Sequence, residues 1–143
     1  MVAVLATVCA AIWAWCCLYL SLIERPGLDL QRNQKRLRHY LVISRQLTPL
    51  LIGVVFAGSA LGIYAWLLSG DRLFLYGGGL LAVMFPLSSI FVVTDSQQVM
   101  EVQTDVYGET MKAVFRRWFY VHILRTALSL VTLALFIVAL WRL

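Results

Sequence analysis

The sequence is short of charge, of histidine and of cysteine. Only 13% of the 143 residues are charged, against about 25% in a soluble domain, so the composition excludes an ordinary soluble protein. The two histidines, His39 and His122, are too few for a histidine-rich metal site, and no metal or cofactor is expected. Because Cys9, Cys16 and Cys17 fall within one apolar stretch, we interpret them as small packing residues and not as a disulfide framework.

The sequence instead contains long apolar stretches. The stretches 2–23, 47–68 and 73–94 are each long enough to cross the roughly 30 Å hydrocarbon core of a bilayer as a helix. The last run, 126–141, would span only about 24 Å, so its helix must begin nearer residue 117. We therefore predict an all-α fold, with a single integral membrane domain over residues 1–143. Its four transmembrane helices (about 2–23, 47–68, 73–94 and 117–141) form an antiparallel bundle. The first stretch lacks a basic leader, which favours a true span over a cleaved signal peptide.

Proline and glycine give more local signals. Pro49 is predicted in the first turn of the second helix, where its missing N–H costs nothing. Gly53, Gly58 and Gly62 leave small faces on that helix, which let a neighbouring helix approach closely. Residues 69–72, Ser-Gly-Asp-Arg, are typical of a tight turn, so we expect the second and third helices to be antiparallel neighbours.

The basic residues are distributed unevenly. Nine Lys and Arg residues lie in or beside the two long loops, against only Arg72 and Arg142 on the other side. By the positive-inside rule, both long loops are cytoplasmic and both termini lie on the opposite side. The net charge of +5 therefore indicates membrane lipids, and not nucleic acid, as the partner. The sequence leaves open whether residues 28–45 form an interfacial amphipathic helix or a basic loop, and residues 101–117 look helical enough to extend the fourth helix.

The predicted topology brings polar groups together at the cytoplasmic end of the bundle. The candidates there are Glu24, Arg45, Asp95, Trp118, Tyr120, His122 and Arg125. Trp118, His122 and Arg125 share one helix face at i, i+4 and i+7. An ionisable residue within a membrane is costly, so it usually faces the protein interior and marks function. At its depth Arg125 needs a carboxylate, a carbonyl or water as a partner, and Asp95 and Glu24 are the candidate carboxylates. The alternatives are an arginine that extends to the lipid headgroups and a purely structural His122.

Two motifs resemble those of a known family. Residues 19–26 read Tyr-Leu-Ser-Leu-Ile-Glu-Arg-Pro, which resembles the YxSLVExPA ending of helix 1 in the anthrone-oxygenase-like family of small four-helix membrane proteins. Residues 117–126 contain Arg117-Trp118-x3-His122-x2-Arg125-Thr126, which resembles the RWxxxHxxRT pattern of the fourth helix. The third helix departs from the family, because members often end it with PTNxxL, where this chain has Thr-Asp-Ser-Gln-Gln-Val and Ser96 replaces the asparagine.

The resemblance implies an inner-leaflet pocket in which an anthrone-type polyketide is oxidised to a quinone by O₂ without an evident cofactor. It implies His122 as the base, Arg125 as the partner of the developing oxyanion, and Trp118 and Tyr120 as walls. Glu24, Asp95 and Arg45 are the further substrate-binding candidates. The Ser96 departure puts the activity in doubt, since the family asparagine is a candidate substrate ligand.

A non-catalytic role is the competing interpretation. Small apolar four-helix chains often serve as subunits or assembly partners of larger membrane complexes. In that case Arg125 and Glu24 act as structural links, and the glycine faces dock another protein. A homo-oligomer or a larger complex is the assembly expected from this interpretation.

Overall fold

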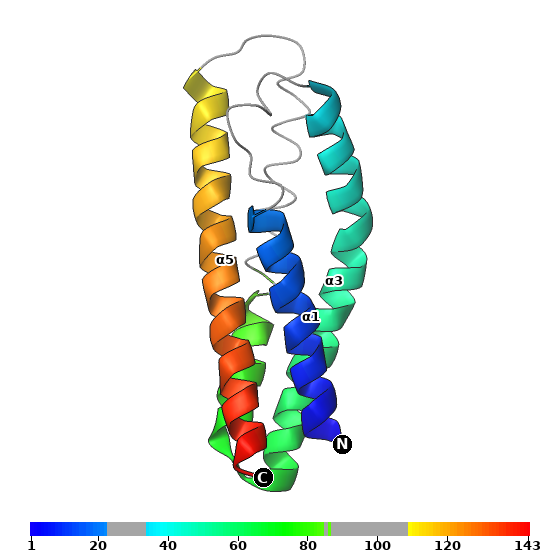
Figure 1. The fold of residues 1–143 in the computed structure, drawn as a ribbon, viewed down its shortest axis with the longest axis vertical. Coiled ribbons are helices and arrows are strands. Elements are labelled where there is room, and N and C mark those ends of the chain that lie inside the picture. The colour runs from blue at the N-terminus through cyan, green and yellow to red at the C-terminus, as the bar shows by residue number, and fades with distance from the viewer. Residues whose placement is uncertain (23–33, 85, 87–108) are drawn as a thin grey trace.

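The computed structural model describes residues 1–22, 34–84, 86 and 109–143. It confirms an all-α four-helix bundle, and the described residues contain no strand. Helix α1 covers Val2–Leu22, α3 covers Gln34–Ser69 and α5 covers Glu109–Trp141, with the shorter apolar helix Arg72–Met84 between α3 and α5 in the chain. Figure 1 shows α1 lying beside both α3 and α5, with the two chain ends at one end of the bundle.

Three of the helices are long and apolar enough to cross a membrane. Their apolar windows are Val2–Tyr19 in α1, Pro49–Ser69 in α3 and Tyr120–Trp141 in α5. The third expected span, 73–94, is described as a helix over Arg72–Met84, and most of its remainder lies outside the described residues. The chain is therefore a helical membrane protein, and the side on which its loops and termini lie stays a prediction.

Helices α3 and α5 are longer than a membrane requires. Their 36 and 33 residues correspond to about 54 and 50 Å of helix, against a bilayer core of roughly 30 Å. Both helices run past the end of α1 on the same side (Figure 1). The expected extension of the fourth helix is confirmed for residues 109–117, and residues 101–108 lie outside the described part.

The beginning of α3 corrects one prediction. Pro49 lies inside α3 and not in its first turn, because the helix already begins at Gln34. A proline there removes one backbone hydrogen bond without ending the helix. Residues 34–45 form neither a separate interfacial helix nor a loop, since they continue directly into the apolar part of α3. Residues 28–33 lie outside the described residues.

The turn between α3 and the short helix is built as the sequence predicts. Gly70 has a φ of +74°, and its N–H donates to the carbonyl of Trp66 over 2.7 Å, which closes the end of α3. The Asp71 carboxylate accepts the N–H of Leu73 over 2.9 Å and so caps the short helix. This turn makes the two helices antiparallel neighbours.

Glycine allows these neighbours to pack closely around Phe136 of α5. A Cβ on Gly77 would overlap the Phe136 ring, and a Cβ on Gly62 would lie 2.8 Å from its Cζ. Phe136 is fully buried and packs against Phe74 with 5.8 Å between ring centroids. A neighbouring helix therefore packs closely against α3 at Gly62, as expected for a face of small residues. At Gly53 no neighbour among the described residues is close, because an added Cβ would meet no atom within 4 Å.

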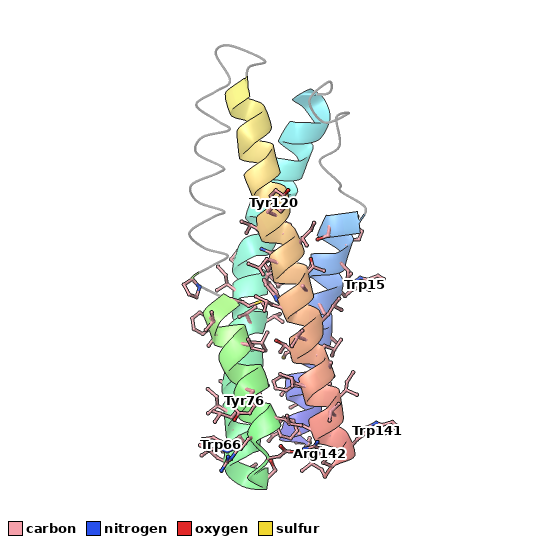
Figure 2. The ribbon with its side chains drawn as sticks, turned by 90° about the vertical axis from the view of Figure 1, so that its left-hand side faces the viewer. Trp15, Trp66, Tyr76, Tyr120, Trp141 and Arg142 are labelled. Carbon is pink, nitrogen blue, oxygen red and sulfur yellow. The ribbon has the colours of Figure 1, made fainter. Side chains whose placement is uncertain are left out.

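Aromatic residues mark the end of the bundle where the termini lie. Trp66, Trp141 and Arg142 gather there, with Tyr76 slightly further along (Figure 2). Trp141 is 91% exposed and Tyr76 is 56% exposed. Tryptophan, tyrosine and arginine at one level are typical of a membrane–water interface, so this end indicates one edge of the bilayer.

Candidate functional site

The buried face of α5 carries polar residues where a membrane bundle usually has apolar ones. His122 and Arg125 are only 7% and 6% exposed, so both face the bundle interior as expected. This burial excludes the alternative in which Arg125 extends to the headgroups. Thr126, Ser129 and Thr132 continue the same face and are also buried. The five positions follow a helical repeat, which keeps them on the side that α1 covers.

Helix α1 contributes the facing residues. Trp13 is 3% exposed and Cys17 is fully buried, and Ser21 follows on the same face one turn later. Neither Trp13 nor Ser21 was among the predicted site residues. Their spacing of eight residues, with Cys17 midway between them, was the available signal, but it does not distinguish them from ordinary packing residues.

Arg125 lies against the indole of Trp13. The guanidinium Cζ is 5.0 Å from the ring centroid, which is a cation–π contact between α5 and α1. Such contacts contribute about 2 kcal/mol when they are removed from water. The Cys17 thiol lies beside the same guanidinium and beside the Ser129 hydroxyl. A cation, an aromatic face and two small polar groups therefore meet at one point between the helices.

Thr126 links the two helices through its hydroxyl group. Its oxygen lies 2.9 Å from the His122 carbonyl, 2.7 Å from the Ser21 hydroxyl and 3.3 Å from the Cys17 carbonyl. A threonine hydroxyl has one proton to donate. The two carbonyl oxygens can only accept that proton, and in the contact between the two hydroxyls either Ser21 or Thr126 can be the donor.

Two buried donors in this cluster have no hydrogen-bond partner among the residues that the structure describes. They are the Nε of Arg125 and the Nε1 of Trp13. A buried donor left without an acceptor costs about 1–3 kcal/mol, and more when it is charged. The described residues also include no carboxylate paired with Arg125. The expected partners Glu24 and Asp95 lie outside the described part of the chain. The arrangement can therefore bind an acceptor oxygen supplied from elsewhere.

Of the other predicted site residues, the structure places only the side chain of Tyr120, which does not join this cluster. Tyr120 is 65% exposed and lies on the outer surface of α5 (Figure 2), so it does not form a wall beside His122. The reason is helical geometry, because two residues along a helix turn the side chain by about 200° at 3.6 residues per turn. Trp118 and Arg45 belong to α5 and α3, but their side chains lie outside the described part of the structure.

The cysteines do not form a metal or disulfide site within the described residues. Cys9, Cys16 and Cys17 are all free, and no three His, Cys, Asp or Glu side chains in the described ranges lie close enough to hold a metal ion. Cys9 packs closely against Gly58 of α3, because a Cβ added to Gly58 would lie 3.0 Å from the Cβ of Cys9. This close contact fits the interpretation of Cys9 as a small packing residue.

Comparison of the chain with protein family models, with curated protein sequences and with solved structures gave no match. The function must therefore be inferred from the chemistry of the cluster between α1 and α5.

Proposed function

We propose that this membrane protein binds a lipophilic aromatic carbonyl compound between α1 and α5 and oxidises it with O₂, as an anthrone oxygenase does. The observation that carries the proposal is Arg125, a cation 6% exposed whose Nε has no acceptor among the described residues. Arg125 lies one helical turn from His122, which is also buried. A base and a cation held inside a membrane bundle, away from bulk water, are the groups that carbanion chemistry needs.

The reaction requires no cofactor. His122 takes a proton from the methylene carbon of the anthrone, and Arg125 stabilises the negative charge that develops on the carbonyl oxygen. The carbanion adds to O₂, and a new carbon–oxygen bond forms at the former methylene carbon. Loss of the second hydrogen from that carbon breaks the oxygen–oxygen bond and releases water. One anthrone and one O₂ thus give one quinone and one water, a four-electron oxidation of carbon balanced by reduction of O₂.

The test is turnover by the purified protein in detergent. An anthrone incubated under air should give quinone absorbance, with one O₂ consumed per quinone and no hydrogen peroxide released. The His122→Ala variant should lose about 100-fold or more in rate, since general base catalysis contributes roughly 10²–10⁴-fold. His39→Ala changes the only other histidine and is the matched control. A wild-type rate equal to that of protein-free detergent contradicts the proposal.

A second candidate is a non-catalytic membrane subunit. Gly53 and Ala57 are both exposed on α3, four residues apart, and nothing lies within 4 Å of a Cβ added to Gly53. Small residues at this spacing let transmembrane helices associate closely. Under this alternative, Gly53→Leu should abolish an assembly that is present in mild detergent, as measured by molecular mass. Gly79→Leu is the control, because Gly79 also has open space but lies on the short helix. A monomeric wild-type protein contradicts the subunit role.

A further inference from the structure

The unpartnered N–H of Trp13 is the strongest feature that the proposed chemistry has not used. Trp13 is 3% exposed, lies in the middle of α1, and has no acceptor for its Nε1 among the described residues. Indole N–H groups that are buried usually find a hydrogen-bond partner. The feature is specific to this tryptophan, because Trp15 of the same helix is 69% exposed on the outer surface (Figure 2).

The second unpartnered donor belongs to the group that touches this indole. The Cζ of Arg125 is 5.0 Å from the Trp13 ring centroid, and the Nε bonded to that carbon also has no acceptor in the described part of the chain. The cluster thus holds two N–H donors, one from α1 and one from α5, on adjacent groups. The nearby hydroxyl of Ser129 does not satisfy either donor, and it donates its own proton to the Thr126 carbonyl over 2.7 Å.

We propose that the indole N–H of Trp13 donates to the ligand oxygen that Arg125 also binds, so that α1 supplies the second donor of an oxyanion site. The inference rests on the proposed function and names a selectivity: the site takes flat lipophilic molecules that carry a carbonyl or phenolate oxygen. Two donors from different helices fix the position of that oxygen, whereas the guanidinium alone fixes only the charge. A ligand without the oxygen leaves both donors unpaired and therefore binds more weakly.

The experiment compares two probes that cannot react. The first is an anthrone whose methylene hydrogens are replaced by methyl groups, so that no proton can be removed there. The second is the same molecule with its carbonyl reduced to a methylene group. Equilibrium dissociation constants for both are measured on the full chain in detergent, together with the infrared carbonyl stretch of the first probe when bound. Trp13→Phe keeps an aromatic ring beside Arg125 but removes the N–H together with one of the two fused rings. The carbonyl-free probe reports the part of the effect that comes from the lost ring, and Trp15→Phe is the control for the same substitution on the exposed side of α1.

The carbonyl probe should bind Trp13→Phe about 3- to 10-fold more weakly than wild type, the range of one hydrogen bond. The carbonyl-free probe should lose only the affinity that comes from the missing ring, and therefore less than the carbonyl probe loses. The carbonyl stretch should move to higher frequency in Trp13→Phe, since the oxygen has lost a donor, and should not move in Trp15→Phe. Trp13→His, which keeps an N–H on an aromatic ring, should retain part of the preference for the carbonyl and provides a second variant.

Three results overturn the inference, and they are distinguishable. An unchanged dissociation constant and carbonyl stretch in Trp13→Phe remove Trp13 from the site but leave the proposed function standing. An equal loss of affinity for both probes assigns Trp13 to packing alone. Failure of the wild-type protein to bind the carbonyl probe overturns the proposed function and this inference together.

Discussion

The two halves of the buried face of α5 differ in chemistry although both are buried. The half nearer the beginning of α5 presents His122, Arg125 and Thr126 to α1. The half nearer the end of α5 presents Phe136 and Ala139, both fully buried. In lipid, an apolar side chain gains little by leaving the solvent, so the apolar half is held by close packing. The polar half contains two buried donors with no acceptor among the described residues, and such donors cost stability. One half therefore stabilises the bundle, and the other is suited to binding.

The largest effect is expected from Phe136→Ala. Removing a fully buried ring from the space between Gly62 and Gly77 leaves a cavity, and the loss should approach the about 3–5 kcal/mol typical of buried Phe→Ala changes. Denaturant titration in detergent micelles measures the free energy of unfolding. Ile137→Ala removes an apolar side chain that is 44% exposed on the neighbouring position, and it should cost far less. Equal losses of unfolding free energy in the two variants would show that close packing does not stabilise the apolar half of the α5 face.

Gly77→Ala should cause the next largest loss of stability. The added methyl group meets the Phe136 ring, and overpacking of this kind costs about 1–3 kcal/mol. Gly79→Ala is the matched control on the same helix, because nothing lies within 4 Å of its added Cβ. It should stabilise the protein by up to about 0.5–1 kcal/mol through helix propensity. Melting temperatures of the two variants should therefore move in opposite directions, and a shared direction would contradict the close contact.

Thr126→Val should have a smaller effect. The variant loses the hydroxyl that joins α5 to Ser21 of α1, and interhelical hydrogen bonds in membranes contribute about 0.6 kcal/mol on average. Thr132→Val provides the control, since the Thr132 hydroxyl donates only to the Leu128 carbonyl of its own helix. A double variant with Ser21→Ala should cost no more than Thr126→Val alone. Additive losses would mean that the two hydroxyls do not interact.

Arg125→Met should change stability least of all. Replacing a buried charged group by an apolar residue of similar volume is often close to neutral, because the cost of desolvating the charge is removed with it. The variant loses the cation–π contact with Trp13, but it also removes a buried donor that has no acceptor in the described part of the chain. The melting temperature should thus stay the same or rise. A marked fall would place Arg125 among the residues that hold the bundle together.

Much of the fold could be predicted because hydropathy and turn chemistry are local signals. The apolar stretches located the membrane-long helices, and the Gly70–Asp71 turn required only the left-handed region and a capping carboxylate. The beginning of α3 could not be predicted from Pro49, because proline is compatible both with a first helical turn and with the interior of a membrane helix. The point at which α3 begins depends on whether the polar residues 34–45 continue the helix, and they do.

Only the part of the candidate site that α5 contributes could be predicted from the sequence. An imidazole and a guanidinium at the edge of an apolar run must be buried or extend to the interface, and burial at 7% and 6% followed for His122 and Arg125. Tyr120 was predicted at the same end of the bundle from the topology and as a wall of the pocket from the family resemblance, but its side chain is 65% exposed because it lies about 200° around α5 from His122. Trp13 was not found, because the pairing of α1 with α5 depends on the packing of the whole bundle. The proposed roles of Glu24 and Asp95 stay predictions.

The central claim is that Arg125 is buried to bind a ligand oxygen and not to stabilise the bundle. The most direct test is the affinity of the methyl-blocked anthrone for wild type and for Arg125→Met, measured in the same detergent with the melting temperature of each. We predict at least about tenfold weaker binding, since a charged hydrogen bond contributes about 1.5–3 kcal/mol, with no loss of stability. Unchanged affinity with a lower melting temperature would contradict the claim.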